Sequence, residues 1–197
     1  FGLASRPAPP ETVSGDACRQ FCDSAGRAQM LLCDGMGTGK PAAVDGQMAA
    51  KLTAQLLQAG VAAESAARLV NVALGLKNAG QESGATLDLL TLDLYTGRAG
   101  LFKAGAAPSF LCRAGVVRTL DGASLPMGVL PTVTGRSTAL TLDVGDTVMM
   151  VSDGALCDGS AWLCDQLTLS TRLGQSPQQT AEAVAASAVR RSGARQD

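Results

Sequence analysis

Leu-Leu-Cys-Asp-Gly-Met-Gly-Thr-Gly, residues 31–39, is the stretch from which the fold of this chain can be predicted. Three apolar residues form a buried strand that ends in one carboxylate, Asp34, and small turn-forming residues follow before an alanine-rich helical pattern begins at Pro41. Gly35 tolerates backbone angles that other residues avoid, so its carbonyl can approach the same point as the Asp34 side chain. Oxygen atoms gathered in this way are ligands for a hard cation.

An aspartate followed by glycine is also an ordinary turn signal, and the chain has five such pairs, at 34, 45, 121, 153 and 158. Each pair taken alone is better explained as a turn than as a site. Only Asp34 and Asp153 follow an apolar, strand-like run, which in the second case is residues 148–152. Two carboxylates at strand ends in one domain favour a cation site over two unrelated turns.

The composition excludes several classes of function. A chain of 197 residues with 46% hydrophobic residues can bury the core of a single domain. Its 16 basic and 17 acidic residues and its 3% aromatic content provide neither basic patches nor stacking platforms, so we expect no nucleic-acid partner. The chain has no histidine, which excludes Ser-His-Asp and Cys-His nucleophiles, histidine-ligated zinc and phosphohistidine chemistry. Hydrolysis by this chain would therefore depend on carboxylates and metal ions.

The cysteines and the two ends of the chain bear on its location. Cys18 and Cys22 lack the spacing of a zinc knuckle, and we interpret the six cysteines as reduced and mostly packed thiols of a cytosolic protein. No apolar run approaches the ~20 residues that span a bilayer, and no signal peptide opens the chain. Residues 1–4 read as the end of a strand begun earlier, and Asp197 follows a helix-ending Gly193. We expect a domain truncated at both ends, from a parent protein that could carry membrane segments.

The first third of the chain predicts a hairpin followed by two helices. Residues 27–33 form the strand that delivers Asp34, and a turn at 23–26 pairs it with a segment that places Asp16 on a short strand or its turn. Apolar residues at helical spacing, each pattern closed by a glycine, then predict helices at 39–59 and 61–77. These amphipathic helices would cover a sheet.

From Thr86 the apolar period changes to two. The alternation predicts an antiparallel meander and then a further hairpin, with strands at 86–94, 98–103, 109–113 and 116–120, and at 137–142 and 147–152. Ser176-Pro177-Gln178-Gln179 is a capping box with proline at the first helical position, which predicts a helix to Ser192. The order helices, strands, helix indicates an α+β sandwich rather than alternating βαβ units.

Six short motifs occur in the order found in PPM-type, metal-dependent protein serine/threonine phosphatases: residues 13–16 (Val-Ser-Gly-Asp), 34–39, 86–88 (Thr-Leu-Asp), 105–110, 125–128 and 152–154 (Ser-Asp-Gly). The chain resembles this family over nearly its whole length, and most closely the phosphatase domain of stage II sporulation protein E. The resemblance implies two antiparallel β-sheets packed as a sandwich and flanked by helices. It also implies a site for two Mn²⁺ or Mg²⁺ ions between the sheets.

The resemblance assigns a role to five residues. Asp34 would bridge both ions and so be the catalytic residue, while the Gly35 carbonyl and Asp16 would serve the first ion. Asp153 would bind the second ion. Asp197 matches the last aspartate ligand of the family.

The same resemblance implies a substrate and a compartment. It implies hydrolysis of phosphoserine or phosphothreonine on a protein of the anti-sigma-factor antagonist type, and through it control of a sigma factor. The domain itself would lie in the cytoplasm without contacting the membrane. The chain departs from some relatives in two ways. It has no histidine to protonate the leaving serine, so a metal-bound water or solvent would do so. Glu11 also stands where a phosphate-binding arginine would fall.

Other interpretations stay open. Residues 35–40 resemble a nucleotide-binding loop, but its first glycine would fall on Asp34, and Pro41 replaces the required serine or threonine. A catalytically weak regulatory or scaffold domain would keep the fold and bind a partner, and a different metallohydrolase could also use aspartate ligands. Helices 39–59 and 61–77 could form a switch that moves the metal loop, or mediate a homodimer; their simplest role is to cover the sheet.

Overall fold

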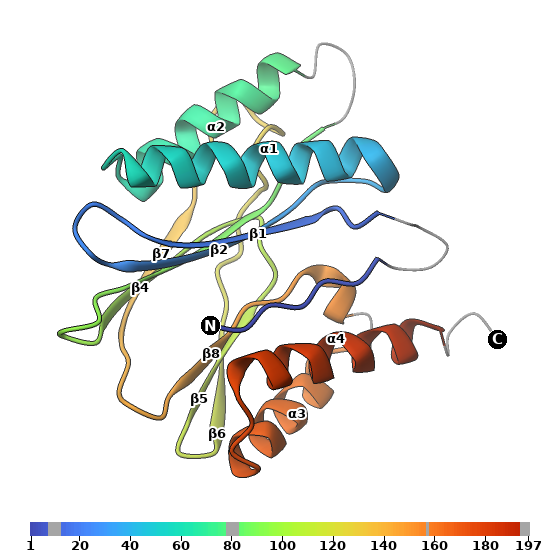
Figure 1. The fold of residues 1–197 in the computed structure, drawn as a ribbon. Helices are drawn as coiled ribbons and strands as arrows, with labels where there is room; N and C mark the ends of the chain where they lie inside the picture. Colours follow the sequence, from blue (N-terminus) through green and yellow to red (C-terminus); the bar gives the residue numbers. More distant parts are fainter. Residues whose placement is uncertain (8–12, 78–82, 157, 194–197) are drawn as a thin grey trace. The chain divides into compact units, whose positions relative to one another are not determined.

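The structure, a computed structural model, describes residues 1–7, 13–77, 83–156 and 158–193. Its contacts divide the chain into two compact units, and we describe each by itself. The five-stranded unit comprises Gly15–Ala106 and Gly122–Asp143, and the three-stranded unit comprises Phe1–Ser14, Ala107–Asp121 and Val144–Asp197. Figure 1 shows the helices and strands of both units. A single phosphatase domain over residues 1–197 stays a prediction.

The five-stranded unit begins with the predicted hairpin. Strand β1 (Asp16–Cys22) pairs antiparallel with β2 (Ala28–Asp34). Asp23 closes the turn, because its Oδ1 accepts hydrogen bonds from two backbone N–H groups of the turn at 2.9 and 3.0 Å and its Oδ2 accepts one from the Arg27 guanidinium at 2.7 Å. The hairpin is confirmed, and Asp16 is the first residue of its first strand.

Three further strands extend this hairpin into a sheet. They are β3 (Leu87–Leu92), β4 (Arg98–Ala104) and β7 (Arg136–Thr141). The strand order is β1-β2-β3-β4-β7, and every neighbouring pair is antiparallel.

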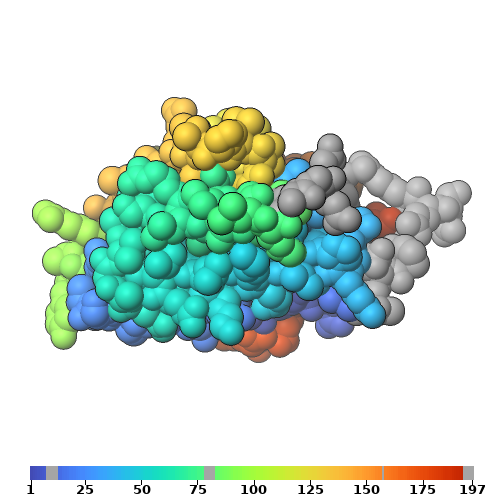
Figure 2. Space-filling view, turned by 90° about the horizontal axis from the view of Figure 1, so that it is seen from above, coloured from blue at the N-terminus to red at the C-terminus, as the bar shows by residue number. Residues whose placement is uncertain are grey.

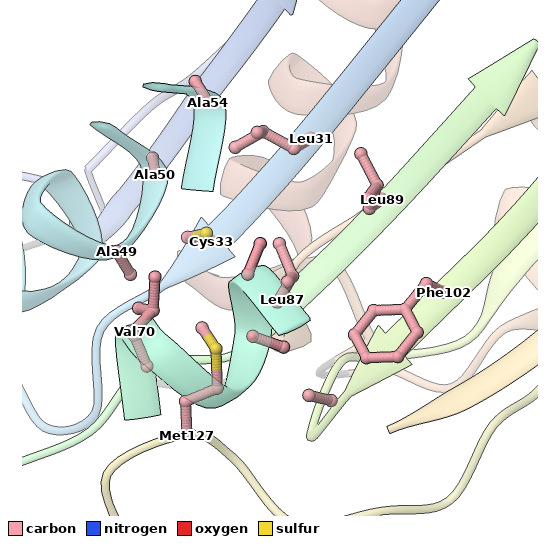
Figure 3. Packing of buried hydrophobic residues seen from close by; sticks show 14 of the residues in the cluster. Leu31, Cys33, Ala49, Ala50, Ala54, Val70, Leu87, Leu89, Phe102 and Met127 are labelled. Atoms are coloured by element: carbon pink, nitrogen blue, oxygen red, sulfur yellow. The ribbon is translucent and has the colours of Figure 1, made fainter. Parts of the chain in front are cut away.

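Helices α1 (Gly39–Gln58) and α2 (Ala63–Lys77) cover one face of the five-stranded sheet (Figure 1). Both begin and end within two residues of their predicted bounds. The core between helices and sheet combines small residues of α1 with larger ones of the strands (Figure 3); among its members are Ala49, Ala50, Ala54, Val70, Leu31, Cys33, Leu87, Leu89 and Phe102. The alanines let α1 lie close to the sheet, which brings its backbone near the loop after β2.

The three-stranded unit has its own sheet and its own helices. Strands β5 (Ser109–Arg113), β6 (Val116–Leu120) and β8 (Thr147–Met149) have the order β6-β5-β8, all antiparallel. A 3-10 helix η1 (Asp153–Leu156) and the helices α3 (Ala161–Arg172) and α4 (Pro177–Gly193) follow. Among the described residues, the buried core of this unit includes Phe110, Cys112, Val151, Trp162, Leu163, Leu167 and Val184.

The start of α4 has the predicted capping box. The Gln179 N–H donates to Ser176 Oγ at 3.2 Å, and the Ser176 N–H donates to Gln179 Oε1 at 2.9 Å. The prediction that residues 1–4 end a strand is wrong. Instead, the Leu3 N–H donates to Gln178 Oε1 and Gln178 Nε2 donates to the Leu3 carbonyl, each at 3.0 Å. The backbone of Leu3 is thus hydrogen-bonded to a side chain of α4 and not to a strand.

Two predicted strand pairings are also wrong. Strands β7 and β8 do not form a hairpin, because β7 pairs with β4 and β8 pairs with β5. The predicted meander is divided in the same way: β3 pairs with β4 and β5 pairs with β6, but β4 and β5 belong to different sheets. Alternating apolar residues identify a strand but do not specify its partner. The predicted α+β class, with two antiparallel sheets and flanking helices, is confirmed.

Among the residues that the structure describes, none of the helices has the length and apolar character needed to cross a bilayer.

Candidate metal centre

Asp16 and Asp34 lie directly opposite each other at the open end of the β1–β2 hairpin. Their neighbours Ala17 and Cys33 belong to the core beneath α1 and α2, so the two aspartates face the other side of the sheet. Directly opposed residues in an antiparallel pair have Cβ atoms ~4.5–5.5 Å apart. Both residues are half-buried. The hairpin therefore brings two carboxylates, predicted from distant motifs, to one point.

The backbone of Asp34 is fixed by Thr86, which precedes β3. The Asp34 N–H donates to Thr86 Oγ1 at 2.9 Å, and the Thr86 N–H donates to the Asp34 carbonyl at 2.8 Å. The Met36 N–H donates to the Gly84 carbonyl at 2.9 Å. These bonds hold the end of β2 and its following loop against the third strand.

Two glycines let α1 lie close to the neighbouring backbone. A Cβ built at Gly35 would lie 1.9 Å from the Ala42 carbonyl oxygen of α1, and one at Gly46 would lie 2.1 Å from the Gly15 carbonyl oxygen. The Gly35 N–H donates to that same Gly15 carbonyl at 3.2 Å. The sequence predicts that residue 35 is glycine because its backbone adopts an unusual angle, and this prediction is wrong. The φ of Gly35 is not positive, unlike that of Gly37. Residue 35 is glycine because helix α1 approaches it too closely to leave room for a side chain.

The donor set at this point suits a hard divalent cation. Two carboxylates and nearby backbone carbonyls are oxygen ligands of the type that Mg²⁺ and Mn²⁺ prefer. Two carboxylates ~4 Å apart repel each other by about 4 kcal/mol at an effective dielectric of 20, and a bound cation relieves this repulsion. Within residues 1–7, 13–77, 83–156 and 158–193, no three acidic or cysteine side chains gather closely enough to hold a metal ion. Asp16 and Asp34 thus fit a metal as part of a ligand set that further oxygens would complete.

The other two predicted ligands lie elsewhere in the chain. Asp153 is exposed and is the first residue of η1, in the three-stranded unit, whereas Asp16 and Asp34 belong to the five-stranded unit. Asp197 lies outside the described residues. The metal-binding roles of Asp16, Asp34, Gly35, Asp153 and Asp197 stay predictions.

Cys18 lies on the same face of the sheet as Asp16, two residues along β1. Burial, and after it the charge of Asp16, raises the pKa of the Cys18 thiol to about 11. Without a bound cation the thiol is therefore protonated at neutral pH.

Two features of the structure are not predicted from the sequence. Asp88 and Lys103 form an ion pair of 2.6 Å inside the five-stranded sheet, and the signal for it was the presence of charged residues within apolar strands. Cys112 and Arg118 have the Cys-x5-Arg spacing of cysteine-based phosphatases. They lie on the paired strands β5 and β6, and Cys112 is completely buried. This geometry excludes a phosphate-binding loop at that motif.

Comparison with known proteins identifies the family of this chain. The model of the family described as Stage II sporulation protein E (SpoIIE) matches residues 24–197. The chain belongs to the SpoIIE family. The SpoIIE proteins of Priestia megaterium and Bacillus subtilis (strain 168) are 31% and 30% identical to it over 142 residues, or 72% of this chain. The alignments cover 24% and 17% of those proteins, so the chain spans a quarter or less of the length of the curated relatives it matches.

A solved SpoIIE structure shows the same fold. The structure of the PP2C phosphatase domain and a fragment of the regulatory domain of SpoIIE from Bacillus subtilis matches with a TM-score of 0.80 and 25% identity, over 96% of this chain and 56% of that one. The predicted resemblance to metal-dependent phosphatases of the SpoIIE type is confirmed. This member of the SpoIIE family therefore has a PP2C-type phosphatase fold.

Proposed function

We propose that this domain is a metal-dependent protein phosphatase that hydrolyses phosphoserine or phosphothreonine on a protein substrate. The observation that carries the proposal is the direct opposition of Asp16 and Asp34 at the open end of the hairpin. Membership of the SpoIIE family and the PP2C-type fold support the same chemistry.

In this proposal each site residue has a distinct role. Asp34 would hold both of two Mn²⁺ or Mg²⁺ ions, Asp16 and the Gly35 carbonyl would hold the first, and Asp153 and Asp197 would hold the second. When bound, such a pair of ions lowers the pKa of water from 15.7 toward ~7 and stabilises charge on the phosphoryl oxygens. Thr86 orients Asp34 through its two hydrogen bonds. Because the chain has no histidine, the proton for the departing oxygen would have to come from water rather than from an imidazole.

Membership of the SpoIIE family supports a proposal for the substrate class. We propose a phosphoprotein of the anti-sigma-factor antagonist type, whose dephosphorylation would control a sigma factor. The domain would face the cytoplasm, and a membrane anchor would belong to another part of a longer parent protein. The length of the curated SpoIIE relatives supports the idea of a longer parent.

The helices after Asp34 offer a surface for a homodimer. Figure 2 is a view onto α1 and α2, whose side chains cover much of this face of the five-stranded unit. Leu69, Val72 and Leu76 form a stripe along α2, and their exposed fractions are 53%, 53% and 78%. Apolar residues aligned at helical spacing and left in water favour association. We propose that two copies of the domain associate through this stripe.

A second candidate function is a catalytically weak regulatory domain of the same fold that binds a partner protein. The absence of histidine from the chain favours it, since some members of the wider phosphatase family use histidine as an acid. Turnover distinguishes the two functions directly.

The deciding experiment measures release of phosphate from a phosphoserine peptide with Mn²⁺ present. We expect turnover by the wild-type chain and background rates for Asp34→Asn, with an unchanged circular dichroism spectrum. Asp143→Asn, the same substitution at an exposed residue, serves as the control and should retain wild-type turnover. Wild-type turnover by Asp34→Asn would reject the bridging role, and a folded, metal-loaded wild-type chain without turnover would favour the regulatory domain.

A further inference from the structure

A buried ion pair lies inside the five-stranded sheet. Lys103 of β4 and Asp88 of β3 are direct partners in the strand register, and Lys103 Nζ lies 2.6 Å from Asp88 Oδ2. Their side chains are only 2% and 1% exposed. Lysine and aspartate are almost never buried to this degree unless they are paired.

The pair lies on the same face of the sheet as the candidate metal ligands. Leu87, Leu89 and Phe102 belong to the core beneath the helices, so Asp88 and Lys103, which alternate with them, face the opposite side.

The register gives the distance from this pair to the candidate site. Asp88 lies opposite Leu32, and Asp34 is two residues further along β2 on the same face. Asp34 and Asp88 are therefore diagonal neighbours on adjacent strands, and two residues in this relation are typically separated by ~7–8 Å. Lys103 lies one strand further away, on the far side of Asp88.

A contribution to stability does not by itself explain why an ion pair is buried here. Removing two charges from water costs several kcal/mol per ion, and replacing a buried pair by apolar residues is often neutral or stabilising. By contrast, a charge ~8 Å from a divalent cation in a poorly screened interior changes the binding of that cation appreciably. Asp88 would attract a cation at Asp34, and Lys103, which holds the Asp88 carboxylate in place, would offset that attraction.

We propose that Asp88 and Lys103 are positioning residues that set the cation affinity of the Asp16–Asp34 site. Lys103 binds the Asp88 carboxylate, so Asp88 contributes charge to the site without becoming one of its ligands. This inference rests on the proposed function only in requiring that a divalent cation binds at Asp34.

Calorimetric titration of chelator-stripped protein with Mn²⁺ tests the proposal without measuring activity. We expect Asp88→Asn to weaken Mn²⁺ binding by roughly tenfold, because the Lys103 charge then acts on the site alone. Lys103→Met should tighten binding by roughly tenfold, because the Asp88 charge is no longer offset. Lys103→Arg, which keeps the charge, should leave the affinity within about threefold of wild type.

Two further variants keep the test valid where a single variant with one buried charge does not fold. Asp88→Asn combined with Lys103→Met removes both charges and should bind Mn²⁺ with an affinity within about threefold of wild type. Asp88→Lys combined with Lys103→Asp keeps a pair but moves the positive charge one strand closer to Asp34, and it should weaken binding by roughly tenfold.

Matched controls change a surface charge of the same sign. Lys51→Met and Asp143→Asn alter exposed residues, and solvent screening should keep their effect on Mn²⁺ affinity below about twofold. If the folded Asp88 and Lys103 variants shift the affinity in the same direction, or not at all, the pair is only structural and the inference is overturned. If the wild-type chain binds no Mn²⁺, the proposed function fails as well, so the two failures are distinguishable.

Discussion

Gly46 of α1 lies against the main chain of Gly15, and a Cβ added at Gly46 would be 2.1 Å from the Gly15 carbonyl oxygen. This contact between two backbones fixes the helix next to Gly15, whose carbonyl also accepts the N–H of Gly35, the residue after Asp34. Gly46→Ala should therefore force α1 outward and destabilise the fold by about 1–3 kcal/mol, the usual range for overpacking.

Gly75→Ala is a matched control for that substitution. Gly75 also lies in a helix, α2, but a Cβ there would meet no atom within 4 Å. Because alanine favours helix more than glycine does, this variant should be more stable by up to ~1 kcal/mol. Urea unfolding of both variants measures the difference, and equal stabilities would show that the contact at Gly46 is not restrictive.

Mn²⁺ should raise the melting temperature of chelator-stripped protein. A ligand that binds only the folded state stabilises it by about 2.7 kcal/mol at a concentration 100 times its Kd. Scanning calorimetry with and without millimolar Mn²⁺ measures the shift, which Asp16→Asn and Asp34→Asn should each reduce or abolish. An unchanged melting temperature in the wild-type chain would count against a metal at this point.

Local sequence signals predicted the parts of the fold on which the candidate site depends. The turn at 23–26 and the strand ending in Asp34 specify the β1–β2 hairpin, and the hairpin register alone places Asp16 opposite Asp34. Apolar spacing closed by glycine was sufficient for α1 and α2 because each helix buries one face against the sheet.

The features that the sequence did not reveal depend on partners distant in the chain. Nothing local to β7 or β8 indicates that they pair with β4 and β5 in different sheets. The pairing of Asp88 with Lys103 depends on the register between β3 and β4. Helix α3 was not predicted because Leu169, 50% exposed, and buried Ser170 blur the apolar period. The need for glycine at Gly35 also depends on a distant partner, because it arises from the close packing of α1.

Lys77 should stabilise the junction of α1 and α2 through Asp45. Asp45 of α1 is almost completely buried, and its carboxylate accepts hydrogen bonds from the Lys77 ammonium and the Ser83 hydroxyl. Lys77→Met would leave the buried carboxylate with one of these partners, at a cost of about 1–3 kcal/mol. Lys51→Met, at an exposed position of α1, should change stability by less than ~0.5 kcal/mol. Equal urea midpoints for the two variants would contradict this role of Lys77.

The cysteines should differ sharply in reactivity. Cys22 is exposed, Cys33 is completely buried, and burial together with the Asp16 charge raises the pKa of Cys18 to about 11. At pH 8 the thiolate fraction of Cys18 should be roughly a hundredfold lower than that of an ordinary exposed thiol. A short iodoacetamide pulse followed by peptide mass spectrometry should find Cys22 modified first and Cys33 last. Early modification of Cys33 would mean that the hairpin opens readily.

Acid should destabilise the protein in part through Asp23. Burial alone would raise the pKa of Asp23, but hydrogen bonds from the backbone of the turn, from Gln29 and from Arg27 outweigh burial and hold the pKa below its ordinary value of 3.8. A carboxyl whose pKa is lower in the folded state contributes stability that is fully present above the unfolded pKa. That contribution is lost as the pH falls from about 4 through the folded pKa.

Asp23→Asn should therefore lower stability at pH 7 by about 1–3 kcal/mol, because an amide cannot accept the full set of hydrogen bonds that the carboxylate accepts. The variant should also lose less stability than the wild type between pH 5 and pH 2, because the titrating group is gone. Urea unfolding at several pH values gives both quantities. Parallel pH profiles for the two proteins would show that the Asp23 carboxyl has the same pKa in the folded and unfolded chains, which the hydrogen bonds across the turn argue against.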